Sequence, residues 1–215
     1  MISKFGNLFV IISILLSFSL IFISVKELKN NINSPSVKIK NLSLLQLFFT
    51  NLTFVILLLG YLFSDFSLIN VYENSHTEKP LLYKVSGVWG NHEGSLLLWI
   101  NILVLFSYLF FTKNLGINKK FQLFTLIFQN ILIIGFFIFL FTTSNPFSEI
   151  FPTPKEGLGL NPILQDPALA IHPPLLYLGF VGSSIYFSAA LASLTSKFTG
   201  KDFASVVRPW ILISW

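Results

Sequence analysis

Five long apolar runs constrain the fold of this chain more than any other feature. A helix needs about 20 predominantly apolar residues to cross a bilayer. A backbone inside lipid must satisfy its own polar groups, which leaves helices or closed barrels, and none of the runs alternates in polarity as barrel strands do. We therefore predict an all-α polytopic membrane protein, one membrane domain over residues 1–215, with spans at about residues 5–25, 42–63, 95–111, 121–141 and 174–194.

The remaining composition supports a membrane protein and excludes several functions. Only 11% of the residues are charged, and the mean hydropathy is +0.75. The chain has no cysteine, which excludes disulfides, iron–sulfur ligation and thiol chemistry by its own residues. The first run lacks a small-residue cleavage site, so we interpret it as a retained helix and not as a signal peptide. The stretch Arg208–Trp215, RPWILISW, is predicted to open a sixth helix.

Lysine and arginine are distributed unequally between the segments that connect the runs. Four of them lie on one side, namely Lys4, Lys79, Lys84 and Lys155, and ten on the other, namely Lys26, Lys29, Lys38, Lys40, Lys113, Lys119, Lys120, Lys197, Lys201 and Arg208. Because positive residues stay on the cytoplasmic or matrix side, we expect the N-terminus and two long loops, about residues 64–94 and 142–173, to face outward. This asymmetry also accounts for the net charge of +5, so we expect no nucleic-acid partner.

The abundance of Phe, Ile, Lys and Asn is typical of an AT-rich genome. We therefore predict a mitochondrial inner membrane, with the N-terminus and the long loops in the intermembrane space. The alternative is an AT-rich bacterium, with the chain in its plasma membrane.

The second long loop ends in a proline-rich motif that contains a histidine. Asp166-Pro167 is a predicted turn, and His172 is followed directly by Pro173 and Pro174. Proline is favoured in the first turn of a helix, so we expect His172 at the outer mouth of the fifth span, where a helix N-terminus favours carboxylates. With no cysteine and only the initiator methionine, histidine is the strongest candidate metal ligand. The alternative is a capping histidine beside a proline stop.

A second motif, SGVWGNHEGSLLLW, covers residues 86–99. We expect Trp89, His92 and Glu93 to form a site that faces the other long loop, with His92 and Glu93 close enough to hydrogen-bond. The alternative is that Trp89 belongs to an interfacial aromatic belt, while Glu93 and Ser95 cap the third span. His76, the remaining histidine, is interpreted as an ordinary loop residue.

Two segments resemble the CcmF family, the membrane component of a cytochrome c haem lyase: WGNHEGSLLLW and LNPILQDPALAIHPPLLYLGFVG, with the flanking NSHTEKPLLYKVSGVWG and the late RPW. The resemblance implies that His172 is the first of two outer-loop histidines that bind the haem being delivered. Trp89, His92, Glu93, Pro173 and Pro174 are expected to lie beside that haem. In the family a second histidine, a tryptophan-rich WWD segment and a transmembrane haem ligand follow downstream, so the chain resembles an N-terminal split-gene fragment or, alternatively, a truncated product.

The same resemblance implies a cofactor, partners and a reaction. Haem would be a transient cofactor, with His172 as one axial ligand and the second ligand on a partner chain. The implied partners are a CcmF-like C-terminal fragment that carries the WWD segment, a CcmE-like haem chaperone, a CcmH-like subunit, apocytochrome c and membrane lipid. The reaction would join haem vinyl groups to apocytochrome thiols, with this chain as a non-autonomous subunit that positions haem. The alternative is a non-haem structural or assembly subunit of a respiratory membrane complex.

Overall fold

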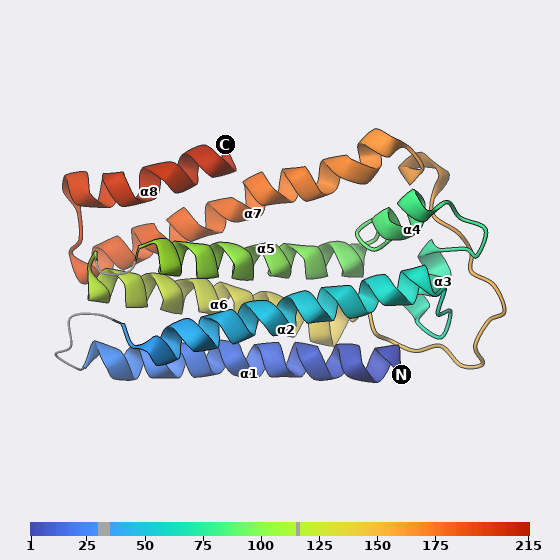
Figure 1. Cartoon of the computed structure of the whole chain (residues 1–215), viewed down its shortest axis with the longest axis horizontal. Coiled ribbons are helices and arrows are strands. Elements are labelled where there is room, and N and C mark those ends of the chain that lie inside the picture. Colours follow the sequence, from blue (N-terminus) through green and yellow to red (C-terminus); the bar gives the residue numbers. More distant parts are fainter. Residues whose placement is uncertain (30–34, 115–116) are drawn as a thin grey trace.

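The chain folds into an elongated helical bundle (Figure 1), seen in a computed structural model that describes residues 1–29, 35–114 and 117–215. Five helices are long and apolar enough to cross a membrane: α1 (Ile2–Leu28), α2 (Val37–Leu62), α5 (His92–Lys113), α6 (Lys119–Thr143) and α7 (Pro167–Ser196). A further helix, α8 (Gly200–Ser214), packs on α7. The predicted all-α polytopic membrane fold is confirmed.

Capping residues explain why several helices begin earlier than hydropathy predicts. The Asn91 side chain accepts a hydrogen bond from the Gly94 N–H at 2.8 Å, so α5 begins at His92 and includes polar residues before its apolar run. Asn118 caps α6 in the same way. Neither Glu93 nor Ser95 is the cap of α5, so that interpretation was wrong. The sixth helix begins at Gly200 and not at Arg208.

The buried faces of α1 and α2 consist largely of small and polar residues. On α1 they are Ser3, Gly6, Val10, Ser13, Ser17, Leu20 and Ser24; on α2 they are Ile39, Ser43, Gln46, Thr50, Thr53, Leu57, Gly60 and Tyr61. Steps of three and four residues place each set along one stripe of its helix. Small residues let helices approach closely in lipid, where apolar side chains gain nothing by leaving the bilayer. Many phenylalanines and leucines of α1 and α2 are therefore exposed on the surface of the bundle, whereas Leu20 and Leu57 are buried.

Buried amides join α6 to helices on two sides. The Gln46 amide of α2 donates to the Ser17 hydroxyl at 2.7 Å and to the Asn130 side chain of α6 at 2.8 Å. The preceding residue, Gln129, faces α7, where it donates to Ser184 at 2.9 Å and accepts from Ser188 at 2.7 Å. Hydrogen bonds of this kind contribute about 0.6 kcal/mol each in a membrane. They fix α6 between α1 and α2 on one side and α7 on the other.

The two long loops, between α2 and α5 and between α6 and α7, form one joint cap at the end of the bundle where the N-terminus lies (Figure 1). The cap contains α3 (Ile69–Asn74), α4 (Leu81–Gly87) and the short 3-10 helix η1 (Pro162–Leu164). Backbone hydrogen bonds join the loops at two places, between residues 67–69 and 148–150 and between residues 72–75 and 157–159. At Gly157 a Cβ atom would overlap the Ser75 carbonyl oxygen, so this approach requires glycine. The two loops are therefore fixed relative to each other by direct backbone contacts.

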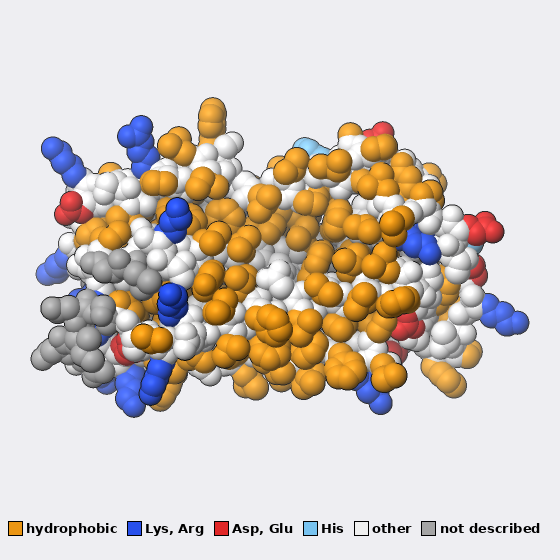
Figure 2. Space-filling view, viewed as in Figure 1, with side chains coloured by type: hydrophobic (Ala, Val, Ile, Leu, Met, Phe, Trp, Pro, Cys, Tyr) orange, Lys and Arg blue, Asp and Glu red, His pale blue; other side chains and the backbone are white. Residues whose placement is uncertain are grey.

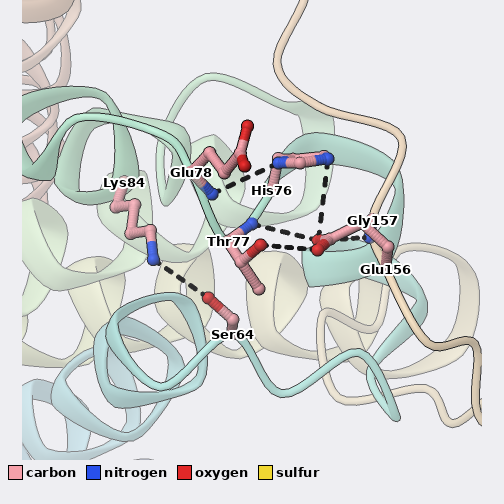
Figure 3. Close-up of polar contacts among 7 residues, drawn as sticks. All are labelled: Ser64, His76, Thr77, Glu78, Lys84, Glu156 and Gly157. Carbon is pink, nitrogen blue, oxygen red and sulfur yellow. Dashed lines mark hydrogen bonds and ion pairs between the residues drawn. The ribbon is translucent and has the colours of Figure 1, made fainter.

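A carboxylate provides a third connection between the loops (Figure 3). Glu156 of the second loop accepts from the backbone N–H of Thr77 at 3.0 Å and from its hydroxyl at 2.5 Å. The His76 Nε2 atom lies 3.9 Å from the same carboxylate, and its Nδ1 atom accepts from the Glu78 N–H. The pKa of Glu156 is lowered from 4.5 to about 2. The largest cause is the hydrogen bond from the Thr77 hydroxyl, followed by the backbone N–H groups of Gly157 and Thr77 and by the nearby His76.

The Glu156 contacts predict an acid-sensitive cap. Because the pKa of Glu156 is depressed in the folded state, its contribution to stability is complete above about pH 4.5 and is lost as the pH falls toward about 2. We expect pepsin cleavage between residues 150 and 160 to increase over this range. In Thr77→Val the increase should begin at a higher pH, whereas Glu149→Gln should behave like the wild type. Identical pH profiles for wild type and Thr77→Val would contradict the assignment.

Candidate functional site

The two predicted motifs meet beneath the cap. Trp89, in the turn after α4, donates its indole N–H to the Ala170 carbonyl of α7 at 2.8 Å. The two residues are 81 positions apart in the sequence. The α4 helix itself contacts both α2 and α7 (Figure 1). The motif around Trp89 and the motif around His172 are therefore parts of one structure.

The α7 helix begins earlier than predicted, which changes the position of His172. The Asp166 carboxylate accepts from the Ala168 N–H at 2.8 Å, and Pro167 is the first helical residue. An aspartate followed by proline is a favourable helix start, although it also resembles a turn. The expectation that the helix starts at Pro173-Pro174 was wrong: both prolines lie inside α7, and His172 lies in its second turn.

A cavity of about 250 Å³ lies where the two motifs meet. It contains three of the predicted site residues, Trp89, His92 and Pro173. Its full lining is Ser86, Trp89, Gly90, Asn91, His92, Ser95, Leu160, Leu164, Ala170, Pro173 and Tyr177. Leu160 and Leu164 come from the second loop, which is the direction that we expected Trp89 and His92 to face. Glu93, His172 and Pro174 are not among the lining residues.

Four polar members of the cavity lining were not predicted as site residues: Ser86, Asn91, Ser95 and Tyr177. The Ser86 side chain is 4% exposed, and its hydroxyl has no hydrogen-bond partner in the part of the chain that the structure describes. Tyr177 lies one helical turn beyond Pro173, on the same face of α7. Spacing along a known helix would have indicated Tyr177, because residues four apart share a face. No pattern in the sequence marks Ser86.

His92 and Glu93 have different partners although they are adjacent. The His92 Nε2 atom lies 3.0 Å from the Ser144 hydroxyl, at the end of α6. The Glu93 carboxylate accepts from the Asn70 side chain at 3.0 Å. The expected hydrogen bond between His92 and Glu93 is not formed among the described residues, because the start of α5 directs the two side chains apart.

A buried network surrounds Glu93 and fixes the start of α5. The Tyr61 hydroxyl donates to the Asn70 side chain at 2.8 Å and accepts from Asn91 at 2.9 Å, and Asn70 donates to Asn91 at 2.7 Å. Four polar side chains from α2, α3 and the start of α5 therefore satisfy one another. Glu93 belongs to this network through Asn70, and it stabilises the start of α5 without lining the cavity.

His172 is exposed and lies near the start of α7, close to the cap. Its imidazole makes no hydrogen bond or ion pair within residues 1–29, 35–114 and 117–215. The other histidines are engaged elsewhere, His76 with Glu156 and His92 with Ser144. No group of three or more His, Asp or Glu side chains among the described residues could hold a metal ion. Among the described residues, His172 is thus the histidine whose ring nitrogens have no protein partner, and a neutral imidazole of this kind could supply a single ligand to a metal ion.

Comparisons with known proteins give a consistent result. The family model described as "Cytochrome C assembly protein" matches residues 89–215. The chain is 49% identical over 178 residues to the cytochrome c-type biogenesis protein CycK of Bradyrhizobium diazoefficiens, covering 82% of this chain and 27% of the relative. It is 40% identical over 165 residues to the cytochrome c-type biogenesis protein CcmF of Escherichia coli, covering 75% of this chain and 25% of the relative. The chain thus spans about a quarter of the length of these curated relatives.

A solved structure described as "Cytochrome c Heme Lyase CcmF" has the same fold. It superposes with a TM-score of 0.82 at 24% sequence identity, over 100% of this chain and 34% of that structure.

Gly94 provides a test of the packing behind the site. A Cβ atom at Gly94 would overlap the Val88 carbonyl oxygen, whereas a Cβ atom at Gly135 would meet nothing within 4 Å. We expect Gly94→Ala to lower the free energy of unfolding in detergent by about 2 kcal/mol. Gly135→Ala, also a helical position, should leave it unchanged or raise it by about 0.5–1 kcal/mol. Equal effects of the two substitutions would show that the close approach at Gly94 does not stabilise the site.

Proposed function

The chain belongs to the cytochrome c assembly protein family, as a relative of CcmF, and on that premise we propose that it binds haem at its outer face for attachment to apocytochrome c. The observation that supports this most is the environment of His172. Its imidazole is exposed on a helix and has no partner among the described side chains. A neutral imidazole in such a position is a suitable ligand for a haem iron.

The role of this chain is to hold and orient its substrate. His172 donates a ring nitrogen to the iron, and the rest of α7 keeps that nitrogen in place through its contacts with α5, α6 and α8. The haem supplies the vinyl groups that become bonded to the apocytochrome thiols. Fixing the direction of approach accelerates such a step through orientation. The chain has no thiol of its own to compete.

We propose that the cap faces outward. Lys and Arg side chains gather mainly at the end of the bundle where α1 ends and α2 begins, while Asp and Glu are more frequent at the cap end (Figure 2). This arrangement supports an inner side at the first end. The curated relatives are bacterial, which favours the plasma-membrane alternative over a mitochondrial inner membrane.

We propose that the second axial ligand comes from a CcmF-like C-terminal partner with a WWD segment. A CcmE-like chaperone would deliver the haem, and a CcmH-like subunit would present apocytochrome c. Family membership supports these roles, and so does the His172 imidazole, which has no partner among the described residues. His92, Trp89 and Pro173 would then form the protein wall next to the haem, through the cavity that they line.

The proposal predicts that one histidine is indispensable and another is not. We expect His172→Ala to abolish covalent haem attachment to c-type cytochromes, measured by haem staining, while the variant inserts into the membrane in normal amounts. His76→Ala is the matched control, because it also removes a solvent-accessible outer imidazole, one that is paired with Glu156. Normal maturation in His172→Ala would reject the ligand role.

A second variant separates ligation from folding. We expect His172→Gly, assayed in the chain purified together with its partner proteins, to lose the Soret absorbance of bound haem and to regain it when imidazole is added. An exogenous ring can replace the missing ligand only if the surrounding structure is intact. A wild-type complex without Soret absorbance would instead support the non-haem structural role.

A further inference from the structure

The carbonyl group of Ala170 lacks its usual helical hydrogen-bond donor, because the residue four positions later is a proline. In an α-helix this carbonyl would accept from the N–H of residue 174, but Pro174 has no N–H. Ala170 is 3% exposed, so bulk solvent has little access to this carbonyl group. The Trp89 indole does so, at 2.8 Å. One tryptophan from a distant segment thereby satisfies a buried acceptor that a proline has released.

The position of this hydrogen bond relates it directly to His172. The histidine lies midway between Ala170 and Pro174, inside the turn that the missing bond would have closed. Pro173 removes the preceding helical hydrogen bond as well, the one to the carbonyl of residue 169. Two consecutive bonds are therefore absent where α7 carries the imidazole. A contact from outside the helix must hold this turn against the rest of the bundle.

We propose that Trp89 is a positioning residue for His172, acting through the carbonyl of Ala170 to hold the helical turn that presents the imidazole. The inference rests on the proposed haem-binding function. A role of Trp89 in an interfacial aromatic belt would require only a ring at the membrane interface. A role as a cavity-lining residue would require only the volume of the ring. Both of those roles would survive loss of the indole N–H.

The chain offers an internal rescue of this contact. Trp89→Phe keeps an aromatic ring and removes the donor. Pro174→Ala returns a backbone N–H to residue 174, which can again bond the Ala170 carbonyl within the helix. If Trp89 acts through that carbonyl, the double variant should recover what the single variant loses. Trp99→Phe is the matched control, because Trp99 is held by ring contacts with Phe136, Tyr177 and Phe180.

The first measurement is haem affinity, by Soret titration of the chain purified with its partner proteins. We expect Trp89→Phe to weaken binding about tenfold, the order expected when a buried acceptor loses its donor. The Trp89→Phe/Pro174→Ala variant should bind like the wild type, and so should Trp99→Phe. The second measurement needs no haem: hydrogen exchange at the amides of Ile171 and His172 should accelerate in Trp89→Phe and return to the wild-type rate in the double variant.

The outcomes separate this inference from the proposed function. If Trp89→Phe has no effect on either measurement, or if Pro174→Ala fails to rescue it, Trp89 does not position the histidine. If His172→Ala binds haem as tightly as the wild type, the proposed function fails whatever Trp89 does. In that case Trp89 has no haem ligand to position, even if hydrogen exchange shows that its hydrogen bond to the Ala170 carbonyl stabilises the turn.

Discussion

The hydrogen bond between the Trp89 indole and the Ala170 carbonyl is the contact that joins the two motifs at the cavity. One motif supplies the donor, and the other creates the need for it by placing Pro174 four residues after Ala170. The cavity beside it is lined by both partners of this bond. Without this hydrogen bond, the turn that contains Pro173 and Pro174 would be less well fixed. The imidazole of His172 would then lose the defined orientation that a ligand requires.

The helical bundle holds in place the segments that the hydrogen bond between Trp89 and Ala170 connects. Small residues on α1 and α2 allow close packing in lipid, and the buried amides of Gln46, Gln129 and Asn130 join three helices to α6. The cap is fixed in turn by backbone bonds between its two loops. Rigidity therefore extends from the membrane core to the outer rim.

Hydropathy was sufficient to predict the spans, because it is a local property of the sequence. It failed at the helix ends, where Asn91 and Asp166 decide the boundary through side-chain caps. Asp166-Pro167 looked like a turn, and only the structure shows a helix start. The cavity is lined by Trp89, His92 and Pro173, three of the six predicted site residues, and not by Glu93, His172 or Pro174. Ser86 could not be predicted, because its burial depends on packing between segments that are distant in the sequence.

We propose that the His172 imidazole binds the haem iron, and magnetic resonance of the ferric complex can detect this bond. Histidine labelled with the heavy nitrogen isotope would be introduced into this chain alone before assembly with its partners. We expect a hyperfine coupling between the iron and a labelled nitrogen, and we expect this coupling to disappear in His172→Gln. Coupling to unlabelled nitrogens only, or a labelled signal that survives the substitution, would show that His172 is not the ligand.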